Sequence, residues 1–370
     1  MADLYPGVSG SYVVNLRVLP TEAMWWRREC PVFHPYVLIS YGLFSQIFRH
    51  DKQTLDEARK YLHIPDYAYV MIDSGGFQAT TKHIESEHVL VWQLNNSTSR
   101  DLIVPLDYPV PIQHDNNIDL VEKLAMKTAK NIELWINKFD KLNSKSQIII
   151  PIHGFREESL RVWWRHVKDY VEITRSVGLG GLAISKSKTL LKKSAFVETL
   201  LPKIKVALDN NVNFIHVFGV GGKFAIPYIF YLEDYLKIKF SFDTSKFSLL
   251  VAKGGIMYPS DPFKNIRKFF RRKDINDNVE LPCHCPACRL FLQSKIPKIS
   301  AYTHYVHLTV TLHNLFSYLA YYDKVCWLTR LGRLEKYIAK NFPEGDKIIS
   351  RTKDYLEGRI TFDNSIRRWL

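Results

Sequence analysis

The sequence has few cysteines and no long uninterrupted hydrophobic run. Five cysteines occur in 370 residues, and three of them fall at 283, 285 and 288. This clustering suits a reducing compartment and a bound metal better than a disulfide framework. The first residues show no basic segment followed by an apolar one, so we expect no secretion signal and a cytoplasmic location. The most apolar late stretch, 305–322, contains two histidines and an asparagine, so we expect no membrane span.

Several familiar catalytic and nucleotide-binding motifs are also missing. The segment GVGG at 219–222 lacks the following Lys-Ser/Thr of a P-loop and the spacing of a dinucleotide fingerprint. Binding of a nucleoside triphosphate or NAD therefore has little support, although a phosphate cradle remains open. Neither a Ser-His-Asp arrangement nor a GxSxG motif occurs. Short repeats, Ser/Gly linkers and low-complexity tracts are absent as well.

Acidic residues are too few to balance the basic ones. Fifty-one Lys and Arg against 37 Asp and Glu leave a formal charge of +14. Such an excess favours polyanionic partners, either nucleic acid or an anionic membrane surface, and carries no information about the fold. The chain is 46% hydrophobic, which is typical of a globular protein with an ample core, and its length permits one large domain or two ordinary ones.

The first two thirds of the chain alternate between short apolar runs and longer segments with apolar residues at helical spacing. This alternation predicts βα units and a parallel sheet. The expected strands are 36–41, 67–72, 102–106, 147–152, 182–184, 214–218 and 240–242. The expected helices are 54–62, 119–142, 157–177, 194–209 and 224–236, with two further ones at 331–342 and 346–356.

Carboxylates, histidine and glycines follow the expected strands. They are Asp73 with Ser74, Gly75 and Gly76; Asp107; His153 with Gly154; Gly180 with Gly181; Gly219 with Gly221; and Asp243. A (β/α)8 barrel keeps its site at the carboxyl ends of its strands. A doubly wound sheet would place ligands only around a switch point, so contributions from so many strand ends favour the closed α/β barrel.

A metal site is indicated by CHCPAC at 283–288. Thiolates from Cys283, Cys285 and Cys288 and one imidazole from a later helix would complete a closed, structural tetrahedral site. His313 is the favoured imidazole, although a lone histidine on an apolar helix is often a core residue and His284 could compete. Chance clustering of inert buried cysteines is the alternative.

Three carboxylates are expected at one mouth of the barrel. Asp73, Asp107 and Asp243 each end an apolar run, although Asp before Gly-Gly is also ordinary turn chemistry. Converging carboxylates repel one another and raise at least one pKa, which destabilises the fold unless the site uses the charge. Paired acids suit chemistry at an anomeric carbon, where one carboxylate attacks and the other moves the proton of the leaving group.

These motifs together resemble the tRNA-guanine transglycosylases, zinc-containing barrel enzymes that exchange guanine for a 7-deazaguanine. The resemblance runs from about residue 67 to about residue 322 and rests on DSGGFQ at 73–78 and on CHCPAC with a distant histidine, with weaker support from GGLA at 180–183 and FGVG at 218–221. It implies that Asp243 is the nucleophile on C1′ and Asp73 the general acid/base. It further implies a purine site at Asp107 and the backbone of Gly181 and Leu182, and zinc at Cys283, Cys285, Cys288 and His313.

The departures from this family pattern bear on the substrate. His153-Gly154 stands where the family usually has Gln-Gly, and Thr244-Ser245-Lys246-Phe247 replaces the Pro-Thr-Arg implicated in reading the anticodon. The chain is also compact and has no room for the RNA-binding extension of archaeal members. It therefore resembles more closely the DpdA-type DNA-guanine transglycosylases of phages and genomic islands, which implies a bacterial or phage-infected host.

Two basic clusters lie near the expected site. The first follows the GGLAIS segment and the second surrounds Phe269 and Phe270 ahead of the zinc loop. Such clusters are often only solvated faces, but here phosphate contact and stacking on an unpaired base are plausible. The residues expected to contact a nucleic-acid backbone are Lys186, Lys188, Lys246, Arg267, Arg271 and Arg272.

The sequence thus predicts an α/β protein with a (β/α)8 barrel core at 1–275, a zinc-binding subdomain with a barrel-closing helix at 276–325, and C-terminal helices at 326–370. The expected activity is exchange of guanine for a preQ-type 7-deazaguanine in DNA. Asp243 and Asp73 are catalytic, and the base site consists of Asp107, Ser74, His153, Gly154, Gly181 and Leu182. The partners are DNA, or alternatively tRNA, and the free base, with structural zinc, no membrane and a possible homodimer. A non-catalytic accessory subunit is a further alternative, and a small-sugar glycosidase would leave the basic clusters and the zinc motif unexplained.

Overall fold

The computed structural model describes residues 1–8, 21–42, 55–76, 84–94, 97–141, 146–181, 193–252, 255–257, 263, 267–268, 284–293 and 301–361. Within them lie two sheets in which every pair of neighbouring strands is parallel, and a separate short antiparallel pair. The five-stranded sheet has the order β1 (Asp3–Pro6), β9 (Lys239–Thr244), β8 (Phe214–Val217), β7 (Ser176–Leu179), β6 (Ile150–Ile152). The four-stranded sheet has the order β2 (Tyr36–Ser40), β3 (Tyr69–Asp73), β4 (Leu102–Ile103), β5 (Gln147–Ile148).

The two parallel sheets adjoin at both of their edges. Ile149 alone separates β5 from β6, and its N–H donates to the carbonyl of Ile103 at 2.8 Å. At the other edge Gly7, directly after β1, forms a parallel bridge with Leu38 of β2. The predicted α/β class with parallel strands is therefore confirmed.

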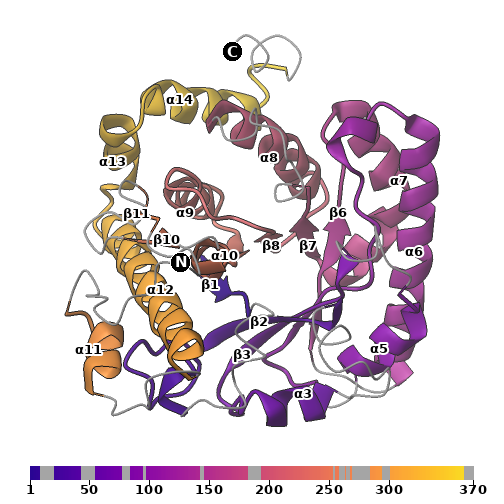
Figure 1. Cartoon of the computed structure of the whole chain (residues 1–370). Helices are drawn as coiled ribbons and strands as arrows, with labels where there is room; N and C mark the ends of the chain where they lie inside the picture. Colours follow the sequence, from indigo (N-terminus) through magenta and orange to yellow (C-terminus); the bar gives the residue numbers. More distant parts are fainter. Residues whose placement is uncertain are drawn as a thin grey trace.

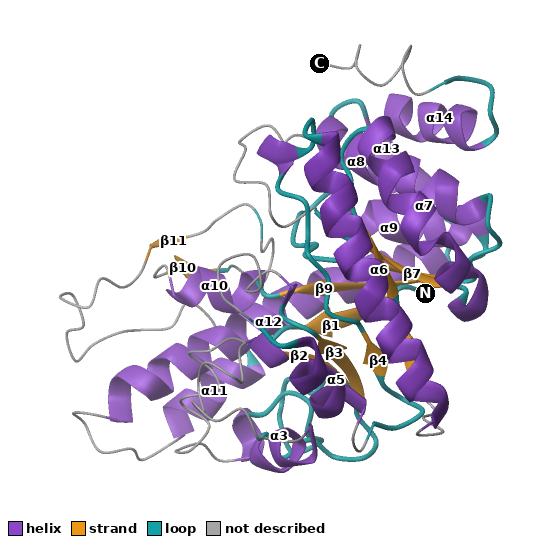
Figure 2. Ribbon diagram, turned by 90° about the vertical axis from the view of Figure 1, so that its right-hand side faces the viewer, coloured by secondary structure: helices purple, strands orange, loops and turns teal. Residues whose placement is uncertain are grey.

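Helices follow most of the strands and surround them (Figure 1). The helices are α3 (Leu55–Tyr61), α5 (Ser86–Leu94), α6 (Ile118–Lys141), α7 (Glu157–Thr174), α8 (Lys193–Leu208), α9 (Ala225–Leu236), α10 (Lys246–Ala252), α11 (Pro286–Gln293), α12 (Ala301–Arg330), α13 (Leu334–Asn341) and α14 (Gly345–Leu356). The antiparallel pair, β10 (Gly255–Ile256) with β11 (Arg267–Lys268), lies to one side of the sheets together with α11 (Figure 2).

Two hydrophobic clusters lie on opposite faces of the strands. The smaller cluster joins Tyr5 of β1, Met71 of β3, Phe214 of β8 and residues near β4 and β5. The neighbours of Met71 along β3, Val70 and Ile72, belong instead to the large cluster that includes the helices. Because successive side chains of a strand point to opposite faces, the small cluster marks the face turned away from the helices.

The same alternation positions polar residues above the small cluster. Asp73 follows Met71 by two residues, His216 follows Phe214 by two, and His153 follows Ile149 by four. Even spacing within β3 and β8 keeps Asp73 and His216 on the face of the small cluster. His153 directly follows β6, so the three residues lie at or near the carboxyl ends of their strands.

Some expected elements differ from the structure. The helix expected at 157–177 ends at Thr174, because Arg175 adopts a left-handed conformation (φ 51°) and Ser176 begins β7. The strand that precedes Gly180 is therefore 176–179, and the segment 182–184 lies outside the described residues. β1 was not expected at all. The long helix α12 passes without a break through residue 325, where the sequence predicts a domain boundary. The division of the chain into three parts stays a prediction.

Candidate active site and metal centre

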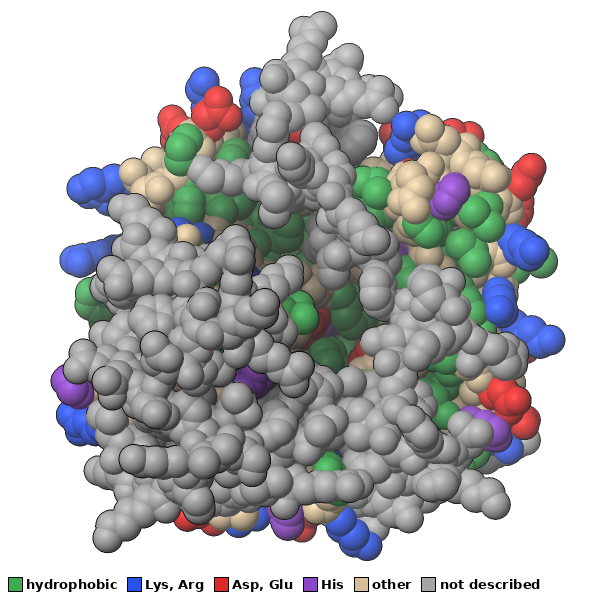
Figure 3. All heavy atoms as spheres, in the orientation of Figure 1, with side chains coloured by type: hydrophobic (Ala, Val, Ile, Leu, Met, Phe, Trp, Pro, Cys, Tyr) green, Lys and Arg blue, Asp and Glu red, His purple; other side chains and the backbone are tan. Residues whose placement is uncertain are grey.

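Asp73 ends β3 beside two other carboxylates. Burial, together with the negative charges of Asp107 and Asp243, raises its pKa to about 7. The three side chains therefore lie close enough to repel one another. In the space-filling view, acidic and hydrophobic side chains lie at the bottom of a hollow near the middle of the face (Figure 3).

The glycines after Asp73 are required by close packing at this point. The N–H of Gly75, which has φ 80°, donates to Asp73 Oδ2 at 3.2 Å. A Cβ on Gly76 would lie 1.8 Å from Asp107 Oδ1, so no larger residue fits without displacing that carboxylate. The DSGG turn thus presents Asp73 and leaves room for Asp107.

Asp107 is paired with His153, as a hydrogen bond between their side chains shows. His153 Nε2 lies 2.6 Å from Asp107 Oδ2, and both residues are buried. Ser74 Oγ lies 3.5 Å from the other oxygen, Oδ1. The second ring nitrogen of His153, Nδ1, is buried and has no hydrogen-bond partner among the described residues. The pair therefore contains one buried polar atom without a described partner, and this atom lies against Gly180.

Gly154, Gly180 and Gly181 pack against this pair and its neighbours. Gly154 has φ +111°, and a Cβ there would lie 2.7 Å from the backbone nitrogen of Leu160. A Cβ on Gly180 would lie 2.3 Å from the His153 ring, and one on Gly181, which has φ +90°, would lie 2.9 Å from the Phe155 ring. Only glycine permits this close approach of backbone to rings. Leu182, the remaining expected base-site residue, lies outside the described residues.

Asp243 is held through one of its two carboxylate oxygens. Its Oδ1 accepts a hydrogen bond from the N–H of Gly219 at 2.8 Å and lies 3.1 Å from His216 Nε2. The other oxygen, Oδ2, has no hydrogen-bond partner in the part of the chain that the structure describes. The carboxylate is thus oriented at one end and unengaged at the other.

His216 was not among the residues expected from the sequence. Its Nδ1 lies 2.8 Å from Ser241 Oγ, and burial lowers the pKa of the ring below its ordinary value, so the ring is neutral near pH 7. A neutral ring that donates from Nε2 to Asp243 accepts at Nδ1 from the Ser241 hydroxyl. One polar residue inside the otherwise apolar strand FIHV was the available signal.

Only Lys246 and Arg267 of the six expected backbone contacts fall on described residues. Lys246 Nζ donates to the carbonyl of Gly221 at 2.8 Å and lies 4.7 Å from the centre of the Phe263 ring, so its ammonium is engaged within the chain. Burial lowers the pKa of this lysine. Arg267 belongs to β11, and the remaining four lie outside the described residues: Lys186, Lys188, Arg271 and Arg272.

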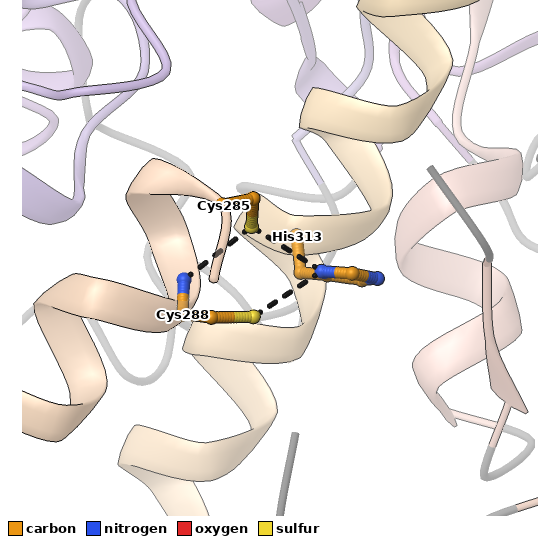
Figure 4. A group of neighbouring side chains, drawn as sticks. All are labelled: Cys285, Cys288 and His313. Carbon is orange, nitrogen blue, oxygen red and sulfur yellow. Dashed lines mark hydrogen bonds between the residues drawn. The ribbon is translucent and has the colours of Figure 1, made fainter. Parts of the chain in front are cut away.

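Two cysteines and a histidine converge between α11 and α12 (Figure 4). His313 Nδ1 lies 3.4 Å from Cys285 Sγ and 3.3 Å from Cys288 Sγ, and all three ligand atoms lie within 4.8 Å of one another. Around a tetrahedral ion with bonds of about 2.3 Å to sulfur and about 2.0 Å to nitrogen, the sulfur to nitrogen distance is about 3.5 Å. The residues therefore fit a metal ion.

The surroundings of these three residues also suit metal binding. His313 Nε2 lies 2.6 Å from the carbonyl oxygen of Met257, which fixes the proton on Nε2 and leaves the Nδ1 lone pair toward the thiols. The Cys288 side chain, and then His313, lower the pKa of Cys285 and favour the thiolate that a metal requires. Cys283 lies outside the described residues, and His284 is exposed. The structure thus brings together three of the four expected ligands.

Comparison with models of known protein families gives no match, and comparison with curated proteins gives none either. No helix within the described residues combines the length and apolar character that a membrane crossing needs.

Proposed function

We propose that the protein is a guanine transglycosylase that exchanges guanine in DNA for a free 7-deazaguanine through a covalent glycosyl-aspartate at Asp243. The observation that carries this proposal is the asymmetry of the Asp243 carboxylate. Two donors hold Oδ1, no described residue hydrogen-bonds Oδ2, and the nearby Asp73 has a pKa of about 7. An oriented carboxylate beside an acid that is half-protonated at neutral pH is the pair that base exchange at C1′ requires.

We further propose that the two parallel sheets close into one (β/α)8 barrel. Their contact at both edges and the small hydrophobic cluster shared by strands of both sheets support this closure. In this arrangement the zinc subdomain is 276–325 and the C-terminal helices are 326–370. We assign the metal as zinc, with Cys283 as the fourth ligand and a structural role, because thiolate and imidazole donors suit zinc and leave no position open.

The reaction proceeds through two displacements at C1′ of the target nucleotide. Asp243 Oδ2 attacks C1′ while the bond from C1′ to N9 of guanine breaks, and Asp73 as a carboxylic acid gives its proton to the departing base. The incoming 7-deazaguanine then loses its N9 proton to the Asp73 carboxylate and attacks C1′, which releases Asp243. Two displacements retain the configuration, and Asp73 is protonated again for the next cycle.

The base is held by residues other than the two catalytic carboxylates. Asp107 accepts from the N–H groups of the guanine edge, His153 orients Asp107 through Nε2, and the glycine backbone permits a flat ring to approach closely. Ser74, Gly154, Gly181 and Leu182 complete this base site.

Duplex DNA is the favoured polymer because the residues that would read an anticodon are replaced at 244–246. The target guanine must then leave the stack, at a cost of a few kcal/mol. Basic residues at the rim offset that cost by contacting phosphates without reading sequence, and the candidates are Lys186, Lys188, Arg267, Arg271 and Arg272. Lys246 is engaged with Gly221, so it needs to change partner before it can serve this way.

The test is incorporation of radiolabelled guanine into duplex DNA and, separately, into tRNA. We expect label in DNA, loss of incorporation by at least about 10³-fold in Asp243→Asn, and unchanged incorporation in Asp234→Asn. Asp234 is a suitable control because it is an exposed aspartate on α9 that pairs with Lys237. Label in tRNA alone would assign the RNA substrate, and label in neither polymer would contradict the activity.

A further inference from the structure

Lys203 is a buried lysine that the proposed chemistry does not use. It lies on α8 and is 1% exposed, and its ammonium donates to the carbonyl oxygen of Gly180 at 2.6 Å. That carbonyl is the only hydrogen-bond partner of Lys203 among the described residues. Burial lowers the pKa of Lys203 to about 7, so the fold gives up stability to keep a lysine here.

The contact with Lys203 sets the direction of the peptide between Gly180 and Gly181. A trans peptide is planar, so the N–H of Gly181 points opposite to the carbonyl of Gly180. Because Lys203 draws that carbonyl toward α8, the Gly181 N–H points away from α8. This N–H has no hydrogen-bond partner in the described part of the chain. Among the described residues, therefore, this N–H is a donor that a ligand in the proposed base site could engage.

Two neighbours keep the lysine and the peptide in place. Asp115 is buried, its negative charge favours the charged form of Lys203, and its Oδ1 accepts from the N–H of Phe155 at 2.9 Å. The Phe155 ring lies 5.3 Å from the Lys203 ammonium and packs on Gly181. The ammonium, the ring and the glycine peptide thus form one packed unit behind the site.

We propose that Lys203 is a positioning residue that makes the Gly181 N–H a reader of the carbonyl oxygen of the bound base. An ammonium on the Gly180 oxygen polarises the shared peptide, which strengthens the N–H as a donor. The ligand class is therefore a base with a lactam oxygen, such as guanine or a 7-deazaguanine. This inference rests on the proposed function, because it assumes that the site binds such a base.

The test compares guanine with 6-thioguanine, in which a weakly accepting sulfur replaces the oxygen and the other edge groups stay the same. Dissociation constants are measured by calorimetry for the wild type, Lys203→Met, Lys203→Gln and Lys205→Met. Lys205 is the matched control because it lies on the same helix, is partly exposed and donates to Leu356 instead.

We expect Lys203→Met to weaken guanine binding about fivefold to tenfold, the value of one hydrogen bond, and to weaken 6-thioguanine binding less than twofold. Lys203→Gln keeps a neutral donor and should recover part of the preference, and Lys205→Met should match the wild type. An equal loss for both bases in Lys203→Met, with circular dichroism and melting temperature unchanged, would overturn the inference. If Lys203→Met does not fold, Lys203→Gln decides the question. A ratio of the guanine and 6-thioguanine dissociation constants equal to that of the wild type would then overturn the role of Lys203.

The two proposals fail in different ways. If the wild type binds neither base, the proposed function fails and the role of Lys203 fails with it. If the wild type binds and exchanges guanine but the preference over 6-thioguanine is the same in every variant, only the role of Lys203 is wrong.

Discussion

Replacing Asp73 with asparagine should stabilise the protein at alkaline pH and leave it unchanged at acidic pH. The structure raises the pKa of Asp73 from 3.8 to about 7 through burial and the charges of Asp107 and Asp243. Between these two values the folded protein holds a proton that the unfolded chain has already lost. Stability therefore falls as pH rises through this window. Asparagine stays neutral throughout and removes this part of the pH dependence.

The size of the effect follows from the shift. Each pKa unit corresponds to about 1.4 kcal/mol, so a shift of about three units sets an upper limit of about 4 kcal/mol. Asp73 is partly exposed, and solvent screening lowers the expected gain to about 2 to 3 kcal/mol at pH 8. At pH 4.5 the unfolded chain has only recently lost this proton, because its pKa is 3.8, so the gain should shrink to less than about 1 kcal/mol.

Urea unfolding at pH 4.5 and at pH 8 measures this difference directly. The exposed control Asp234→Asn should change the free energy of unfolding by no more than about 0.5 kcal/mol at either pH. The same Asp73→Asn protein should have lost base exchange. A gain in stability that is equal at both pH values, or no gain at pH 8, would refute the argument that the three carboxylates crowd one another.

Three further outcomes are expected. The stability of the wild type should rise between about pH 7 and pH 10, by up to about 1.4 kcal/mol per unit, because the unfolded chain still holds the Lys203 proton that the folded chain has lost. This contribution should be missing in Lys203→Met, and urea midpoints at pH 7 and pH 9.5 check it. Treatment with a strong chelator should lower the melting temperature of the wild type, while Cys288→Ser should start lower and respond little, as calorimetry would show. In steady-state kinetics, His216→Leu should lower kcat about tenfold to thirtyfold and leave the KM for guanine unchanged. His216→Gln should recover part of the loss because it keeps a donor for Asp243.

The strand ends could be found from the sequence because parallel strands are buried on both faces. A run such as YVMID is apolar until its last residue, so a carboxylate there stands out as the first polar group at the edge of the sheet. The same reasoning located Asp107 and Asp243. The candidate metal site could also be predicted, since Cys285 and Cys288 are close in sequence and only His313 is distant.

Other features depend on partners that are remote in the sequence. β1 is only four residues long and pairs with β9, which lies more than 200 residues later in the sequence. No local sequence pattern therefore identifies β1 as a strand. Lys203 stands in the segment LLPKIKVAL, where alternating lysines look like a solvated helix face, although the structure buries one of them and leaves Lys205 partly exposed. A single histidine in an apolar strand is usually a core residue, so the strand alone assigns no role to His216, which depends on the remote Asp243.

The most direct test of the account is to trap the covalent intermediate. The wild type is incubated with duplex DNA without any incoming base, quenched with acid, digested and analysed by mass spectrometry. We predict one guanine released per adduct and a nucleotide attached to the peptide at Asp243, with no adduct in Asp243→Asn. Guanine exchange without any adduct, or an adduct on another residue, would contradict the assignment of Asp243 as the nucleophile.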